Sequence, residues 1–176
     1  MKLKNYIMLC NVAGIYYDPS YSKESRESYK YATRHILNNY KLLHRRFELQ
    51  QDIIAQVKQL LSASDWDTVS EEKIYRVLWE GACDNISDLH ISCIKVLEEV
   101  RVAVTMLKAI PDKGNELYKI IDYYYLKDGY DLSTEEVISM CGISASSFFK
   151  SKSIAMNEIM YNLWGYTKEE RNKLKM

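Results

Sequence analysis

The sequence has few of the features that enzymes and metal proteins need. Its three histidines and four cysteines show no metal-ligand spacing, and no Cys-x-x-Cys pair occurs. Glycine-rich phosphate loops, nucleophile elbows and paired-carboxylate motifs are also missing from the sequence. We therefore expect neither an enzyme nor a bound metal or cofactor. The cysteines are interpreted as reduced thiols in the core of a cytoplasmic protein.

Proline is scarce, and β-strand patterns are lacking. The two prolines, Pro19 and Pro111, both mark boundaries between segments. Apolar residues recur at spacings of three and four rather than in alternation, which is typical of helices. No uncharged apolar run approaches the length needed to cross a membrane. The sequence therefore predicts an all-α protein without a membrane-spanning segment.

Two long helices are predicted in residues 1–110, which we interpret as a helical hairpin or oligomerisation region. The segment 22–61 contains no Gly or Pro, and its apolar residues follow a seven-residue repeat. The segment 70–109 carries a second apolar stripe at steps of three and four. The two stripes can pack together as an αα-hairpin, or the first helix can pair with its own copy in a dimer.

The charge of the chain is balanced in total but not in its distribution. There are 24 Lys and Arg against 24 Asp and Glu, whereas a nucleic-acid binder usually has a basic surplus. Residues 1–62 hold ten basic and five acidic side chains, and residues 63–112 hold five and ten. The basic first third can pair with the acidic middle or supplement a weakly charged binding element elsewhere.

Residues 132–163 predict two helices joined by a three-residue turn. Ser133 and Glu136 have the spacing of a capping box, in which each side chain bonds the other residue's backbone amide. Gly142 favours a left-handed helix end, and Ser144 is suited to cap the next helix. A helix over 117–129 would supply the third member of a helix-turn-helix domain, which we assign to residues 111–176.

This region resembles the region-four DNA-binding domain of bacterial sigma factors. Within that superfamily it is most similar to the ArpU/RinA-type late-transcription regulators of phages that infect Gram-positive bacteria. The resemblance runs over residues 117–156. It rests on Tyr-Leu-Lys-Asp-Gly at 125–129, Glu-Glu-Val at 135–137, Gly-Ile-Ser at 142–144, Phe148-Phe149, Lys150, Lys152 and Ala155-Met156. It implies that the helix after Gly142 enters the major groove of DNA.

The candidate DNA-binding residues lie at the start of that second helix. They are Ser144, Ser146, Ser147, Lys150, Lys152 and Ser153. Two lysines attract phosphates weakly, so we expect a dimer to supply a second half-site. Phe148 is predicted to be a core residue. Phe149 either packs on the preceding helix, which we favour, or contacts a thymine methyl group.

One side of the first long helix is basic. Its Lys and Arg side chains lie within about a 100-degree arc beside the apolar stripe. They are Arg26, Lys30, Arg34, Lys41 and Arg45. This basic stripe is either a solvated surface or a second contact to the DNA backbone or to RNA polymerase.

These observations favour a sequence-specific DNA-binding transcriptional regulator of phage late genes. It would act on double-stranded DNA as a homo-oligomer in the bacterial cytoplasm, with RNA polymerase as a further partner. One alternative is a small-terminase-like subunit of phage DNA packaging. Another is a protein-binding module, such as an anti-repressor or polymerase-binding factor, without DNA binding. The neutral charge favours that module, and so does Ile138, because such motifs usually have Ala or Gly at this helix crossing.

Overall fold

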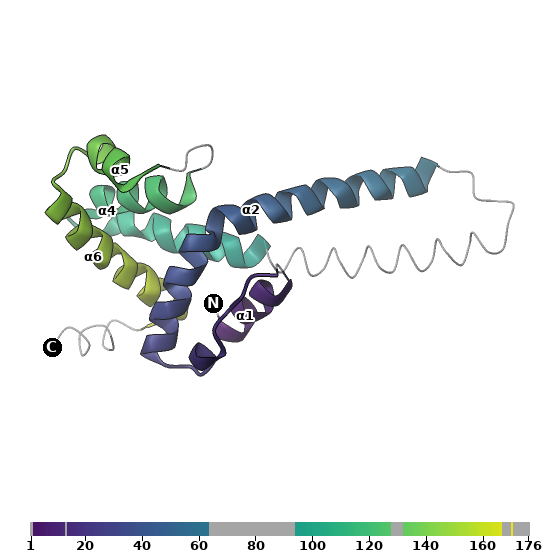
Figure 1. Ribbon diagram of the computed structural model, residues 1–176, viewed down its shortest axis with the longest axis horizontal. Coiled ribbons are helices and arrows are strands. Elements are labelled where there is room, and N and C mark those ends of the chain that lie inside the picture. The colour runs from purple at the N-terminus through teal and green to yellow at the C-terminus, as the bar shows by residue number, and fades with distance from the viewer. Residues whose placement is uncertain (1, 13, 64–93, 128–131, 167–169, 171–176) are drawn as a thin grey trace, which may run out of the picture. The chain divides into compact units, whose positions relative to one another are not determined.

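The computed structural model describes residues 2–12, 14–63, 94–127, 132–166 and 170 (Figure 1). Most of these residues are helical and none is in a strand, so the expected helical class is confirmed for them. None of the described helices combines the length and the apolar character that a membrane crossing needs. Contacts group the chain into a first unit, Met1–Leu42 with Val96–Met176, and a second unit, Leu43–Lys95.

The first long helix is present as α2 (Arg26–Ala63), which starts in the first unit and ends in the second. It begins four residues later than predicted, because Ser25 caps it: the Ser28 amide donates to Ser25 Oγ at 3.1 Å. Ile36, Tyr40 and Leu43 of the predicted apolar stripe are buried. Of the second long helix, residues 94–105 are described as helix and residues 70–93 lie outside the described residues.

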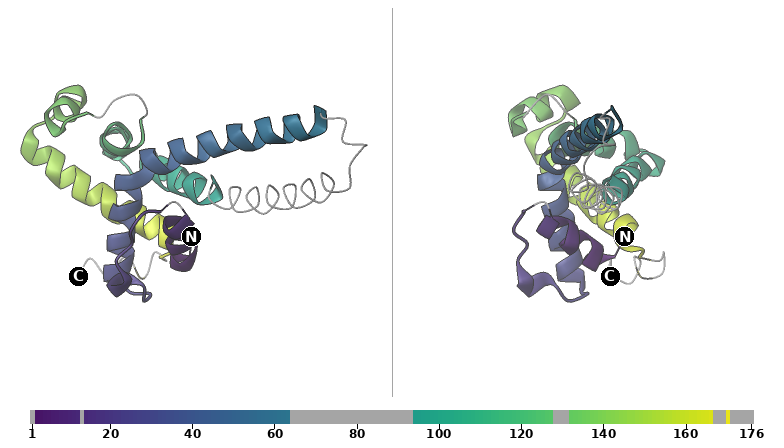
Figure 2. Two further views of the ribbon diagram at one scale, coloured as in Figure 1. Left: turned by 45° about the vertical axis from the view of Figure 1, so that its right-hand side comes forward. Right: turned by 90° about the vertical axis from the view of Figure 1, so that its right-hand side faces the viewer.

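The amino-terminal helix α1 (Leu3–Val12) lies beside the first part of α2 (Figures 1 and 2). Leu3, Tyr6 and Leu9 are buried, so the helix turns one apolar side towards the unit. His35 of α2 bonds both to α1 and to the segment that follows α1. Its Nε2 donates to the Tyr16 carbonyl at 2.9 Å, so its Nδ1 accepts from the Tyr6 hydroxyl at 2.6 Å.

Three helices of the first unit, which lie next to one another in Figure 1, share a small apolar core. They are α4 (Gly114–Ile121), α5 (Thr134–Cys141) and α6 (Ala145–Trp164). Ile120, Val137 and Phe148 contribute one fully buried side chain each, which confirms the prediction for Phe148. Ile138 is half-buried and packs against this core, so its larger side chain is accommodated at its edge.

The turn between α5 and α6 has the predicted caps. The Ser133 amide donates to Glu136 Oε2 at 2.7 Å, and the Glu136 amide donates to Ser133 Oγ at 3.2 Å. Gly142 ends α5 with a φ of 64°, and Ser144 Oγ accepts from the Ser147 amide at the start of α6. The capping-box prediction is therefore confirmed.

The segment before α5 differs in detail from the predicted helix over 117–129. It starts earlier, with α4 at Gly114, and continues as a π-helical turn, η3 (Asp122–Leu126). Gly114 is buried directly against the short helix η2 (Met106–Ala109) and the residues around it. A close approach of this kind suits glycine because it has no side chain.

Candidate nucleic-acid interface

The side of α6 opposite the core carries small polar and basic side chains. Phe148, Ser151 and Ala155 mark its buried side. At about 100 degrees per residue, Ser146, Lys150 and Ser153 fall on the opposite side. All three are exposed, so we refer to them as the outward face of α6. This face combines hydroxyl groups with one cation.

Two of the predicted serines have a structural role in the first turn of α6. Ser144 Oγ accepts from the Ser147 amide at 3.2 Å and donates to Ser147 Oγ at 2.9 Å. Ser146 Oγ lies 3.1 Å from the same Ser144 oxygen. The three hydroxyls are thus gathered at the amino-terminal end of the helix, where unpaired backbone amides and the helix dipole attract negative charge.

Lys152 lies at the border of the buried side of α6. It is half-buried, and its Nζ stands 3.5 Å from the ring centroid of Tyr124. Burial lowers the pKa of Lys152 below its ordinary value. The cation–π contact orients this ammonium towards η3 rather than towards the outward face.

Phe149 does not pack on the preceding helix as predicted. Its side chain is 60% exposed, and its ring meets the edge of Phe148 at a centroid distance of 5.3 Å. The physical reason is the helical rotation of about 100 degrees per residue, which turns Phe149 out of the core that Phe148 enters.

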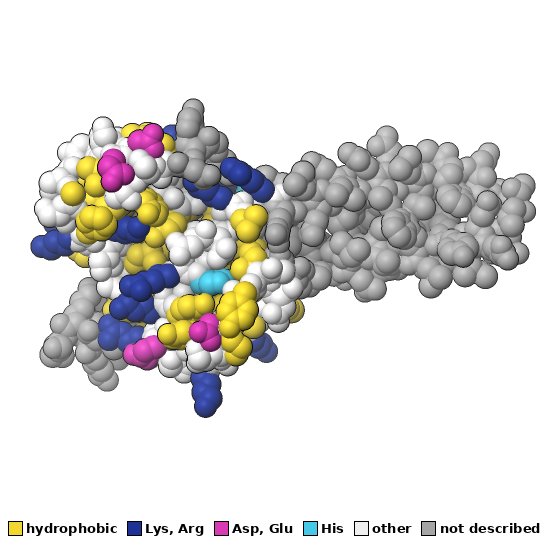
Figure 3. Space-filling model, in the orientation of Figure 1, with side chains coloured by type: hydrophobic (Ala, Val, Ile, Leu, Met, Phe, Trp, Pro, Cys, Tyr) yellow, Lys and Arg dark blue, Asp and Glu magenta, His cyan; other side chains and the backbone are white. Residues whose placement is uncertain are grey.

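The basic stripe is largely accessible on α2. Arg26, Lys30 and Arg34 are exposed in the first unit and Lys41 is half-buried there, while Arg45 of the second unit is exposed. Figure 3 shows Lys and Arg side chains at several separate places on one face of the first unit, among hydrophobic and other side chains. Lys30 and Arg34 line a pocket beside α6, and Arg26 is not among its lining residues.

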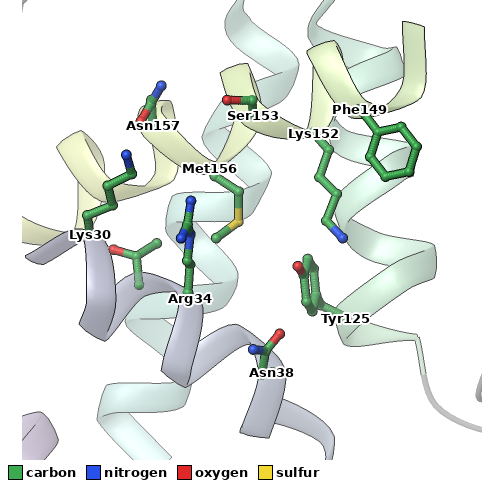
Figure 4. A pocket seen from close by; sticks show the side chains of 10 residues that line it. Lys30, Arg34, Asn38, Tyr125, Phe149, Lys152, Ser153, Met156 and Asn157 are labelled. Atoms are coloured by element: carbon green, nitrogen blue, oxygen red, sulfur yellow. The ribbon is translucent and has the colours of Figure 1, made fainter. Parts of the chain in front are cut away.

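A pocket of about 310 Å³ lies between α2 and α6 (Figure 4). Its cationic lining consists of Lys30 and Arg34 from α2 and Lys152 from α6. The polar lining comes from Thr33, Asn38, Ser153 and Asn157, and the apolar lining from Tyr125, Phe149 and Met156. Among the described residues, no Asp or Glu lines it. The pocket is therefore a positively charged space with one apolar wall.

The two helices that form this pocket are joined at one end by the side chain of Trp164. Its indole Nε1 donates to Thr33 Oγ1 at 2.9 Å, and its ring stacks on Tyr29 at 5.1 Å between centroids. The Thr33 hydroxyl in turn donates to the Tyr29 carbonyl at 2.7 Å. This junction fixes the cations of α2 relative to α6.

Comparisons with family models, with curated proteins and with solved structures found no match. Within the described ranges, no group of three or more His, Cys, Asp or Glu side chains could hold a metal ion. The functional interpretation therefore depends on the geometry of α5, α6 and the basic part of α2.

Proposed function

We propose that the protein binds double-stranded DNA in a sequence-specific manner and regulates transcription, as its resemblance to phage late-gene regulators implies. In this proposal α5 and α6 act as a helix-turn-helix, and α6 enters the major groove. The observation that carries the proposal is the outward face of α6. Its exposed Ser146, Lys150 and Ser153 stand on a helix that a buried core and two caps hold in place.

The proposed contacts differ in what they contribute. Lys150 and the amino-terminal end of α6 attract phosphates whatever the base sequence. Ser146 and Ser153 can bond base edges, although a hydroxyl discriminates weakly between bases. Because one copy offers little positive charge, the proposal includes two further sources of affinity. They are a homo-oligomer that presents two copies of α6, and the basic stripe as a second contact to the DNA backbone.

The test is selection from a fragmented library of the neighbouring genome at low and moderate salt. The wild type should enrich one sequence. Lys150→Ala should weaken binding to all sequences and reduce the slope of log affinity against log salt by about 1. Lys4→Ala, which removes the same charge from the exposed side of α1, is the matched control and should bind like the wild type. Retention of no fragment at either salt would refute DNA binding.

A protein-binding module is the second candidate. The exposed Phe149 (60%) and Met140 (51%) on neighbouring helices favour it, as does the zero net charge. A small-terminase-like subunit would also bind DNA but would form rings, so its molar mass in solution would exceed that of a dimer. A search for protein partners follows only if no DNA fragment is retained.

A further inference from the structure

The described lining of the pocket between α2 and α6 carries three cations and no carboxylate. Among the described residues, Lys30 and Arg34 have no hydrogen bond or ion pair with any side chain. Lys152 contributes a third cation, which rests against aromatic rings instead of a carboxylate. Cations that share a partly enclosed space repel one another, and an anion in that space would offset the repulsion.

The opposite wall of the pocket suits a flat ring. In Figure 4, Phe149 and Tyr125 lie at one side with the Lys152 side chain between them, Met156 lies in the middle, and Lys30 and Arg34 lie across from the two rings. Aromatic faces and a thioether pack well against a planar ligand. The amides of Asn38 and Asn157 line the same space and offer both donors and acceptors.

We propose that this pocket binds a small aromatic phosphate ester of the nucleoside monophosphate class. The phosphate lies between Lys30 and Arg34, where the guanidinium can donate two parallel hydrogen bonds to it. The ring lies on the Met156 side of the aromatic residues, within reach of Phe149 and Tyr125 and beside the Lys152 ammonium. The volume of about 310 Å³ is at the lower end of the range for small-ligand sites, which fits a mononucleotide better than a dinucleotide.

This proposal goes beyond DNA binding and does not depend on it. The outward face of α6 carries the proposed base contacts, and the pocket lies at the side of that helix, with Ser153 at the border between the two. Lys30 and Arg34 also belong to the basic stripe, so a phosphate of the DNA backbone is another source of the same chemistry. The experiment must therefore compare free nucleotides with a DNA duplex.

The experiment is calorimetric titration of the full-length protein at low ionic strength. The ligands are the four nucleoside 5′-monophosphates, inorganic phosphate, and adenosine without phosphate. We expect at least one monophosphate to bind with a stoichiometry of one, inorganic phosphate to bind more weakly, and adenosine not to bind. Arg34→Gln should weaken monophosphate binding by roughly 10- to 100-fold, because it removes charged hydrogen bonds.

Matched variants separate the pocket from general charge effects. Arg26→Gln changes an exposed cation on the same helix outside the pocket, and monophosphate binding should be unchanged. Phe149→Ala should weaken binding of the monophosphate but not of inorganic phosphate. Because Arg34 and Phe149 are exposed, both variants should fold, and circular dichroism checks this.

Three results would overturn the proposal. The first is that no monophosphate binds at millimolar concentration, and the second is that Arg34→Gln binds the monophosphate like the wild type. The third is that Arg34→Gln weakens binding to a duplex while no free nucleotide binds, which would assign the cations to the DNA backbone. If Lys150→Ala loses duplex binding but still binds the monophosphate, the two ligands use separate sites, and the result supports both proposals.

Discussion

Replacing Gly114 with alanine tests how closely α4 approaches the preceding segment. A Cβ atom at this position would stand 2.5 Å from the carbonyl oxygen of Leu107. It would also stand 2.7 and 2.9 Å from the carbonyl oxygen and carbon of Lys108. All three are backbone atoms, so no side-chain rotation can relieve the contacts. The chain around η2 would have to shift for the methyl group to fit.

Two opposing effects determine the size of the change in stability. In a helix interior, alanine is favoured over glycine by about 1 kcal/mol, and the gain is smaller at the first residue of a helix. Overpacking of a tightly packed site costs roughly 1–3 kcal/mol. Since three separate backbone contacts fall below 3.0 Å, we expect the cost to lie in the upper part of that range. The net expectation for Gly114→Ala is a loss of about 1–2 kcal/mol in the free energy of unfolding.

Urea unfolding followed by circular dichroism measures this difference, as a lower midpoint with an unchanged dependence on urea concentration. Asn115→Ala is the control, because Asn115 is exposed on the next position of α4. Its free energy of unfolding should stay within about 0.5 kcal/mol of the wild type. A Gly114→Ala protein as stable as the wild type, or more stable, would refute the close approach of α4 to η2.

Three further predictions concern the first unit. Ser151 is 5% exposed and donates to Glu116 Oε1 at 2.6 Å. Ser151→Ala should therefore lower the free energy of unfolding, measured with urea, by about 1–2 kcal/mol. In a double-mutant cycle with Glu116→Ala, additive losses would contradict this bond. Burial lowers the pKa of His35 below its ordinary value of 6.5, so the unfolded chain binds more protons near that pH. The unfolding free energy should therefore decrease as the pH falls from about 7 to 5, and His35→Gln should decrease less over the same range. Phe148→Ala should lower the free energy of unfolding by roughly 3–5 kcal/mol, because it leaves a cavity in the core. An unchanged midpoint of thermal unfolding would contradict the shared core of α4, α5 and α6.

The local features of α5 and α6 could be predicted because each depends on a few neighbouring residues. Ser133 and Glu136 form their capping box within one helical turn. Gly142 adopts its left-handed conformation because a residue without Cβ pays little for it there, and Ser144 follows as the next cap. The burial of Phe148 could be predicted from apolar spacing. Its neighbour Phe149 is exposed because it lies about 100 degrees further round the helix.

The features that could not be predicted depend on tertiary packing. The helical spacing of Leu3, Tyr6 and Leu9 was available in the sequence, but the hairpin interpretation left α1 without a role. The meeting of Lys30 and Arg34 with Lys152 has no local signal, because the residues come from distant parts of the chain. Each of these three residues was predicted separately as a possible contact to DNA. The pocket that they share, with its aromatic wall, required the structure.

The bond between Thr33 and Trp164 has a consequence for how the protein is made. The two residues are separated by 131 positions, and the whole second unit lies between them in the sequence. At a synthesis rate of about 5–20 residues per second, Trp164 follows Thr33 after roughly 7–26 s. During that time the Thr33 hydroxyl and the Tyr29 ring lack the indole that they contact in the finished unit. The part of the first unit that leaves the ribosome first is therefore the part that waits longest to fold, and we expect chaperones to bind it in the interval.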